Sequence, residues 1–138
     1  MSQENVELMY RAVDAFNRRD LNAFLAIVDD DVEAVPRAVA MEGSYHGHEG
    51  VRRWWKDVFD VWPDFTSQVV EMRDVDDLTV AAVHLRGHAA GSDIPLDEPG
   101  WQVNRWRRGK CVWWRGFNTR DEALEAVGLS EQDAHADS

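Results

Sequence analysis

Two histidines and a glutamate lie within residues 46–49 of this 138-residue sequence, which read His-Gly-His-Glu. An unperturbed histidine has a pKa of about 6.5 and therefore suits proton transfer near neutral pH, and histidine and glutamate are also metal ligands. Gly47 and Gly50 instead indicate the start of a helix, where His48 or Glu49 is explained equally well by capping and by the helix dipole. We therefore expect no metal site. His46 is the candidate proton shuttle, and the alternative is a solvent-exposed histidine.

Two amide side chains lie at alternate positions beside tryptophans. Gln102, Asn104 and Trp106 share one face of a predicted strand, and Trp114 and Gly116 share one face of the next. Amides donate and accept hydrogen bonds but cannot act as bases near neutral pH. One interpretation is an aromatic box that holds a planar or polycyclic ligand, with both amides donating hydrogen bonds to a substrate oxygen. The other is an ordinary packed core with satisfied amides.

A further pair of histidines, His84 and His88, shares one face of the predicted strand at residues 78–89. The opposite face carries Val83 and Leu85 and should point toward the core. We therefore expect both histidines on the outer face of the sheet, in water or at a subunit interface. A shift of one residue in register would turn them inward.

The composition describes one acidic domain. There are 26 Asp and Glu residues against 15 Lys and Arg residues, so the net charge is −11. This charge argues against binding to nucleic acid or to an anionic membrane, although basic and aromatic residues are mixed over residues 105–115. The sequence shows neither a secretory signal nor a membrane span, and its one cysteine cannot form an internal disulfide. We expect a cytoplasmic protein without a cofactor.

Hydrophobic periodicity predicts helices first and then a series of strands. Apolar residues recur at helical spacing in four segments and at strand spacing in five. The predicted helices cover residues 3–18, 21–28, 47–62 and 119–128, and the predicted strands cover residues 32–35, 65–73, 78–89, 101–107 and 110–117. Asp20 is placed to cap the second helix. This order predicts an α+β domain with an antiparallel sheet.

The final predicted strand is apolar on both faces. Val112, Trp114 and Gly116 alternate with Cys111 and Trp113. A half-solvated antiparallel strand should be polar on one face, so both faces should be covered. Helices can cover one face, and a second subunit is the simplest cover for the other. We therefore expect a homodimer formed through the sheet.

Three segments together resemble a known family. They are ENVELMYRAVDAFNRRDLNAF, YHGHEGVRRWWKDVFDVWPDF and RRGKCVWWRGFNTRDEALEAVGL. They are similar to the SnoaL-like branch of the nuclear transport factor 2-like superfamily, in its actinobacterial form. The resemblance implies a cone-shaped α+β barrel, with N-terminal helices packed in a strongly curved mixed or antiparallel sheet and an apolar pocket at one end. The domain should cover residues 1–129, and residues 130–138 should form an acidic, disordered tail.

Ketosteroid isomerase shares this fold and uses a carboxylate base with a tyrosine and a protonated aspartate as hydrogen-bond donors. By the resemblance, the tyrosine position falls on Ala12, the base position on Ala34 and the aspartate position on Gln102. The isomerase mechanism is therefore not supported. The resemblance also places Trp55 at a pocket position, and it places Met41 and Tyr45 in a loop at the mouth.

The first functional hypothesis is a cofactor-independent acid-base enzyme, of the cyclase, isomerase or hydratase type, that acts on a small hydrophobic metabolite. Its site would combine His46, Gln102 and Asn104 with ligand-binding side chains at Met41, Tyr45, Trp55, Trp106, Trp114 and Gly116. The second hypothesis is a non-catalytic ligand-binding protein. The third is a dimerisation domain without a ligand.

Overall fold

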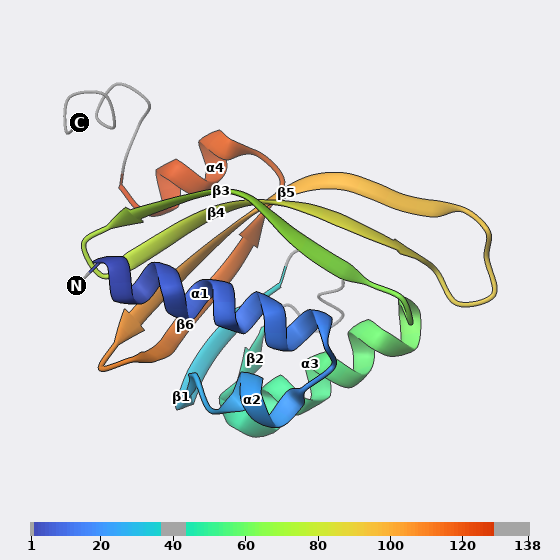
Figure 1. Ribbon diagram of the computed structural model, residues 1–138, viewed down its shortest axis with the longest axis horizontal. Coiled ribbons are helices and arrows are strands. Elements are labelled where there is room, and N and C mark those ends of the chain that lie inside the picture. The colour runs from blue at the N-terminus through green and yellow to red at the C-terminus, as the bar shows by residue number, and fades with distance from the viewer. Residues whose placement is uncertain (1, 37–43, 129–138) are drawn as a thin grey trace.

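The computed structural model of the protein describes residues 2–36 and 44–128. The helices are α1 (Ser2–Asn17), α2 (Leu21–Leu25), α3 (Gly47–Val61) and α4 (Arg120–Ala126), and the strands are β1 (Val28–Val35), β2 (Tyr45–His46), β3 (Thr66–Val75), β4 (Leu78–His88), β5 (Pro95–Arg107) and β6 (Lys110–Phe117) (Figure 1). No helix in this described part of the chain is long and apolar enough to cross a membrane.

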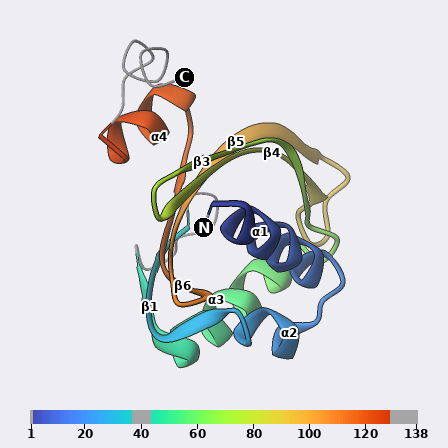
Figure 2. The ribbon, with the colours of Figure 1, turned by 60° about the vertical axis from the view of Figure 1, so that its left-hand side comes forward.

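The strands form one six-stranded sheet in the order β2-β1-β6-β5-β4-β3. Neighbouring strands run antiparallel, except that β1 and β6 run parallel. The sheet curves around α1, with α2 and α3 on the same concave side and α4 on the opposite side (Figure 2). The predicted α+β cone is therefore confirmed, and its sheet is mixed and stays open between the edge strands β2 and β3.

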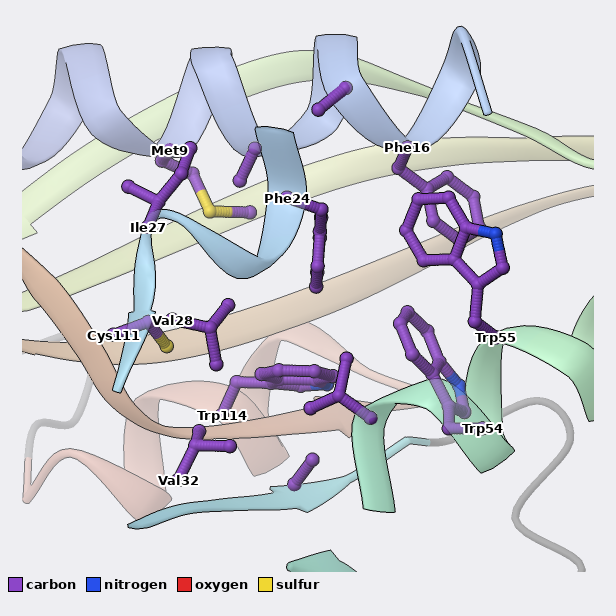
Figure 3. Close-up of a cluster of buried hydrophobic side chains, with 14 of the residues drawn as sticks. Met9, Phe16, Phe24, Ile27, Val28, Val32, Trp54, Trp55, Cys111 and Trp114 are labelled. Atoms are coloured by element: carbon purple, nitrogen blue, oxygen red, sulfur yellow. The ribbon is translucent and has the colours of Figure 1, made fainter. Parts of the chain in front are cut away.

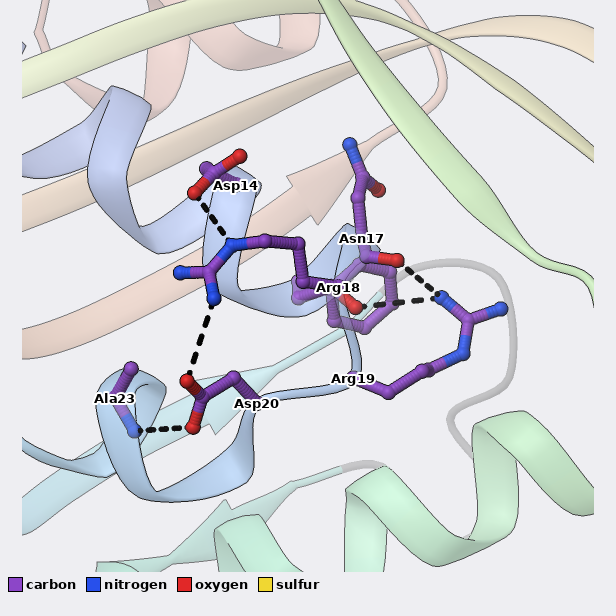
Figure 4. Close-up of polar contacts among 7 residues, drawn as sticks. Asp14, Asn17, Arg18, Arg19, Asp20 and Ala23 are labelled. Carbon is purple, nitrogen blue, oxygen red and sulfur yellow. Dashed lines mark hydrogen bonds and ion pairs between the residues drawn. The ribbon is translucent and has the colours of Figure 1, made fainter.

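The turn between α1 and α2 is fixed by charged side chains (Figure 4). Oδ1 of Asp20 accepts a hydrogen bond from the Ala23 N–H at 3.0 Å, which confirms the predicted cap of α2. Arg18 donates from Nε to Asp14 at 2.7 Å and from Nη1 to Asp20 at 3.4 Å. These contacts set the direction in which α2 leaves α1.

Two strands extend further than the hydrophobic pattern predicts. β5 begins at Pro95 rather than at residue 101, because residues 95–100 pair with β4 alone. The opposite edge of this segment has no partner among the described residues, so a proline without an N–H can occupy it. β1 begins at Val28 rather than at residue 32, because Val28 already pairs with Cys111 of β6, and the three aspartates lie where the register shifts between Val28 and Glu33.

The outer face of the sheet carries its own apolar cluster. Leu78, Val80, Val103 and Phe117 are buried there beneath Ala123 of α4. Thr119 starts α4 with a capping box, in which its side chain and that of Glu122 bond each other's backbone N–H. The short C-terminal helix thus covers a face that we expected a second subunit to cover, and Trp101 and Trp113 stay partly exposed beside it.

Candidate functional site

A cavity of about 110 Å³ lies between the concave face of the sheet and the helices. Side chains from α1, α2, α3 and the central strands line it, and most of them are apolar or aromatic. The aromatic members on the helices are Phe16, Phe24 and Trp54, and those on the sheet side include Phe65, Trp106 and Trp114. A concave, mainly apolar cavity of this kind is the usual form of a small-molecule site.

The aromatic rings are arranged mostly edge to face (Figure 3). The ring centroids of Trp54 and Trp114 are 5.1 Å apart at 64°, and those of Phe24 and Trp114 are 5.9 Å apart at 88°. Phe16 stacks on Trp54 at 5.6 Å. These are favourable aromatic geometries, and each ring limits the rotation of its neighbours. The walls of the cavity are therefore shaped before any ligand arrives.

Asn104 is the most deeply buried polar side chain of the lining, with 3% of its surface exposed. Its Nδ2 donates to Sγ of Cys111 at 3.4 Å, and the Cys111 thiol in turn donates to the Trp113 carbonyl oxygen at 3.3 Å. Oδ1 of Asn104 has no hydrogen-bond partner. An unpaired buried acceptor is costly, so this atom is poised to receive a donor.

Two other polar groups near the cavity, the Trp106 indole N–H and the Cys111 thiol, are not available for hydrogen bonding or acid-base chemistry with a ligand. Nε1 of Trp106 donates to Oγ1 of Thr79 at 2.9 Å, so this indole N–H is satisfied. Burial raises the pKa of the Cys111 thiol to about 11, so it remains neutral at physiological pH and is not an activated nucleophile.

The structure brings five of the predicted site residues together at the cavity. Gln102, Asn104, Trp106, Trp114 and Gly116 all contribute to its lining. Asn104 faces Trp114 and Gln102 faces Gly116 across the β5–β6 pair, in the alternation that the sequence predicted. The aromatic and amide faces of the two strands therefore share one surface.

The remaining predicted residues lie elsewhere or are not described. Tyr45 is buried, and its hydroxyl donates to Asp57 at 3.1 Å instead of facing the cavity. His46 is exposed at the start of α3 and is not part of the lining. Met41 lies outside the described residues.

Trp55 packs in the core, and its neighbour Trp54 lines the cavity in its place. Trp55 contacts the rings of Phe24 at 5.2 Å and Phe59 at 5.4 Å. Successive helical residues point about 100° apart, so only one of two adjacent tryptophans can face the cavity. The sequence offers no signal that decides between them.

Cys111 is a lining residue that the alternation missed. A bulge between Arg105 and Trp106 pairs Trp106 with Cys111 and so turns the cysteine inward. Met9 and Phe16 of α1 also line the cavity, and their helical spacing placed them on the buried face without showing that this face borders an open volume.

His84 and His88 lie on the outer face of β4, as expected, while Val83 and Leu85 point inward and line the cavity. His84 bonds Asp97, and Nδ1 of His88 lies 2.8 Å from Oδ2 of Asp64. No Asp, Glu, His, Lys, Arg or Tyr among the described residues lines the cavity. In the same part of the chain, no group of three His, Cys, Asp or Glu side chains could hold a metal ion.

The profile of the SnoaL-like domain matches residues 9–114, which is well over half of the chain and includes nearly all of the cavity wall. The chain belongs to the SnoaL-like family. The search of curated proteins finds no match for this SnoaL-like protein.

Solved structures with the same fold cover almost the whole chain. An NTF2-like protein of unknown function from Burkholderia pseudomallei is 21% identical, with a TM-score of 0.77 and coverage of 92% of this chain and 97% of that one. A hypothetical protein from Catenulispora acidiphila with a ketosteroid isomerase-like fold, in complex with trimethylamine, is 17% identical, with a TM-score of 0.74 and coverage of 91% and 95%. IdmH from Streptomyces antibioticus, a proposed polyketide cyclase, is 19% identical, with a TM-score of 0.73 and coverage of 91% and 99%.

The three positions that the resemblance assigns to the isomerase catalytic residues hold neutral side chains in this SnoaL-like protein. Ala12 lines the cavity, Ala34 is fully buried in β1, and Gln102 lies on the cavity wall. The cavity can therefore enclose and orient a small molecule, but its described wall offers no side chain that is a base or an acid near neutral pH.

Proposed function

We propose that this SnoaL-like protein binds a small hydrophobic metabolite in the cavity, with the aromatic rings as walls and the amides of Gln102 and Asn104 as the groups that orient it. The observation that carries this proposal is the neutral, mainly apolar lining, about a third of which is aromatic. Apolar and aromatic surface with a few placed polar groups supplies affinity through burial and supplies orientation through hydrogen bonds.

Catalysis is the second candidate function, supported by the structural likeness to a proposed polyketide cyclase. A cyclase, isomerase or hydratase of this kind would need a proton carrier at the ligand. The expected carrier, His46, is exposed at the start of α3 and is not among the lining residues. Binding without acid-base chemistry therefore explains the described site better than catalysis does.

Calorimetric titration tests the binding proposal. We expect one or more compounds from a panel of monocyclic and polycyclic aromatics to bind the wild-type protein with a 1:1 stoichiometry. Gly116→Leu adds an isobutyl group at the wall and should abolish binding while the unfolding temperature changes little. Arg115→Leu is the matched control because Arg115 is exposed and points away from the cavity. Failure of every compound to bind, or unchanged binding by Gly116→Leu, would refute the proposal.

Turnover of the bound compounds separates the two candidate functions. If the protein only binds, no product forms, and His46→Ala leaves the dissociation constant unchanged. Product formation that is lost in His46→Ala would instead establish the acid-base enzyme.

A further inference from the structure

Resting on the proposed binding function, we infer that the ligand is a neutral molecule of about one ring that donates a hydrogen bond, from a hydroxyl or an N–H group, to Oδ1 of Asn104. The inference reverses the direction of the bond that the sequence suggested, in which Asn104 donates to a substrate oxygen.

The orientation of the Asn104 amide carries the argument. Nδ2 is directed at Cys111 Sγ, 3.4 Å away, and the thiol proton is directed at the Trp113 carbonyl oxygen, 3.3 Å away. The sulfur therefore acts as an acceptor toward the amide, and the amide must place its N–H toward it. This leaves the oxygen as the unpaired atom.

The position of Asn104 makes this oxygen relevant to a ligand. The residue lines the cavity and is opposite Trp114 on β6, whose ring is 5.1 Å from that of Trp54. Trp54 and Trp114 contact each other directly, so a ligand ring packs against this pair rather than between its members, and there it lies next to the amide. A donor on that ring satisfies Oδ1, which is otherwise buried without a partner, whereas an ether or ketone oxygen placed there would face it with a second acceptor and be repelled. Nε1 of Trp54 is also buried without a partner on this lining, and it is a donor, so a hydroxyl group that donates to Asn104 still keeps a lone pair for it.

The cavity volume limits the size of the ligand. An apolar protein cavity of about 150 Å³ holds benzene, so a cavity of comparable size holds one ring with a small substituent. The volume here is about 110 Å³. We therefore replace the expectation of a polycyclic ligand with that of a single ring.

The charge of the ligand follows from the lining. No described lining residue carries a charge, so an ionised ligand would be buried without a counterion, which is strongly unfavourable. The net charge of −11 further disfavours an anion. A phenol or a heteroaromatic N–H compound fits these conditions, and a carboxylate does not.

Phenol, toluene and anisole test the inference by calorimetry at neutral pH. Phenol and toluene match in shape, but only phenol donates a hydrogen bond, and anisole carries an oxygen that only accepts. Toluene leaves water more readily, so an apolar cavity without a directed acceptor favours toluene. We expect the wild-type protein to prefer phenol over both by about tenfold or more.

Two variants connect that preference to Asn104. Asn104→Leu replaces the amide with an apolar side chain of similar size and should reduce the preference for phenol by about tenfold. Cys111→Val removes the sulfur that orients the amide, so the amide can reverse and the preference for phenol over anisole should fall. Asn22→Leu, on the exposed surface of α2, is the control and should keep the wild-type preference.

The outcomes distinguish this inference from the proposed function on which it rests. If none of the compounds, monocyclic or polycyclic, binds, the binding function itself fails. If toluene or anisole binds as tightly as phenol, or if Asn104→Leu keeps the preference for phenol, the cavity binds ligands but the acceptor role of Asn104 is wrong.

Discussion

At the scale of single residues, the chemistry of the cavity depends on which of its polar groups already form hydrogen bonds within the protein. Asn104 donates to Cys111 and Trp106 donates to Thr79, whereas Oδ1 of Asn104 and Nε1 of Trp54 are buried without a partner. Burial keeps the pKa of the Cys111 thiol near 11, so the pair stays uncharged across the physiological range. A ligand therefore meets a fixed pattern of neutral groups rather than a titrating site.

Asn17 stabilises the fold through two hydrogen bonds of its side chain. Its Nδ2 donates to the Ser67 carbonyl oxygen at 2.8 Å, and its Oδ1 accepts from the Ser67 N–H at 3.0 Å, so it joins the end of α1 to β3 as a neighbouring strand would. We expect Asn17→Ala to lower the free energy of unfolding by about 1–3 kcal/mol, measured by urea denaturation. Asn22→Ala, exposed on α2, should change it by less than about 0.5 kcal/mol. Equal effects of the two substitutions would contradict this role.

At the scale of helices and strands, local sequence patterns predicted most of the elements, whereas some strand ends and side-chain directions depend on strand pairing. Asp20 marked the start of α2, as the structure confirms, because a cap acts locally. β1 likewise ends at Val35, directly before Pro36, which has no N–H to donate. The extension of β5 to Pro95 and the inward turn of Cys111 depend on which strand lies alongside and on a bulge, and neither leaves a periodic signal. The candidate site was therefore predictable on β5 and β6 by alternation, but not on α3.

Two carboxylates with shifted pKa values stabilise the β4–β5 hairpin: Asp64 joins it to the segment before β3, and Asp97 of β5 contacts His84 of β4 within it. The side-chain hydrogen bond from His88 is the largest cause of the lowered pKa of Asp64, followed by the bond from the His88 backbone N–H. The hydrogen bond from His84 likewise lowers the pKa of Asp97. A carboxylate with a lowered folded-state pKa stabilises the fold above its unfolded pKa of about 3.9, and this contribution is lost as the pH falls through the folded value.

We therefore expect acid to loosen this hairpin. In an NMR titration, the carboxyl carbons of Asp64 and Asp97 should titrate below pH 3.8, the ordinary value for aspartate. His88→Ala should raise the pKa of Asp64 toward the ordinary range, although the backbone N–H of residue 88 still lowers it in part, and it should leave the pKa of Asp97 unchanged, so Asp97 serves as an internal control. The difference in unfolding temperature between the wild type and Asp64→Asn should also shrink between pH 6 and pH 3, and a difference that grows toward acid would have the wrong sign.

At the scale of the whole molecule, the two faces of the sheet serve different purposes. The concave face surrounds the cavity, whereas the convex face buries a second cluster under α4. Because α4 covers Leu78, Val80 and Phe117, the apolar character of β6 on both faces does not by itself require a second subunit. The predicted homodimer now rests on Trp101 and Trp113, which are only partly buried beside that helix.

The oligomeric state can be tested at this surface without disturbing the cavity. Light scattering after size exclusion should give twice the mass of the 15.8 kDa chain. Low salt should weaken the dimer, because two subunits of net charge −11 repel each other more strongly when fewer ions screen them. Trp113→Glu should place a charge in the interface and give a monomer that still binds ligand, since Trp113 lies outside the cavity lining. Val70→Glu, at a side chain that is 68% exposed on β3, is the matched control and should leave the mass unchanged. A wild-type monomer at all concentrations would show that α4 alone is a sufficient cover for the convex face.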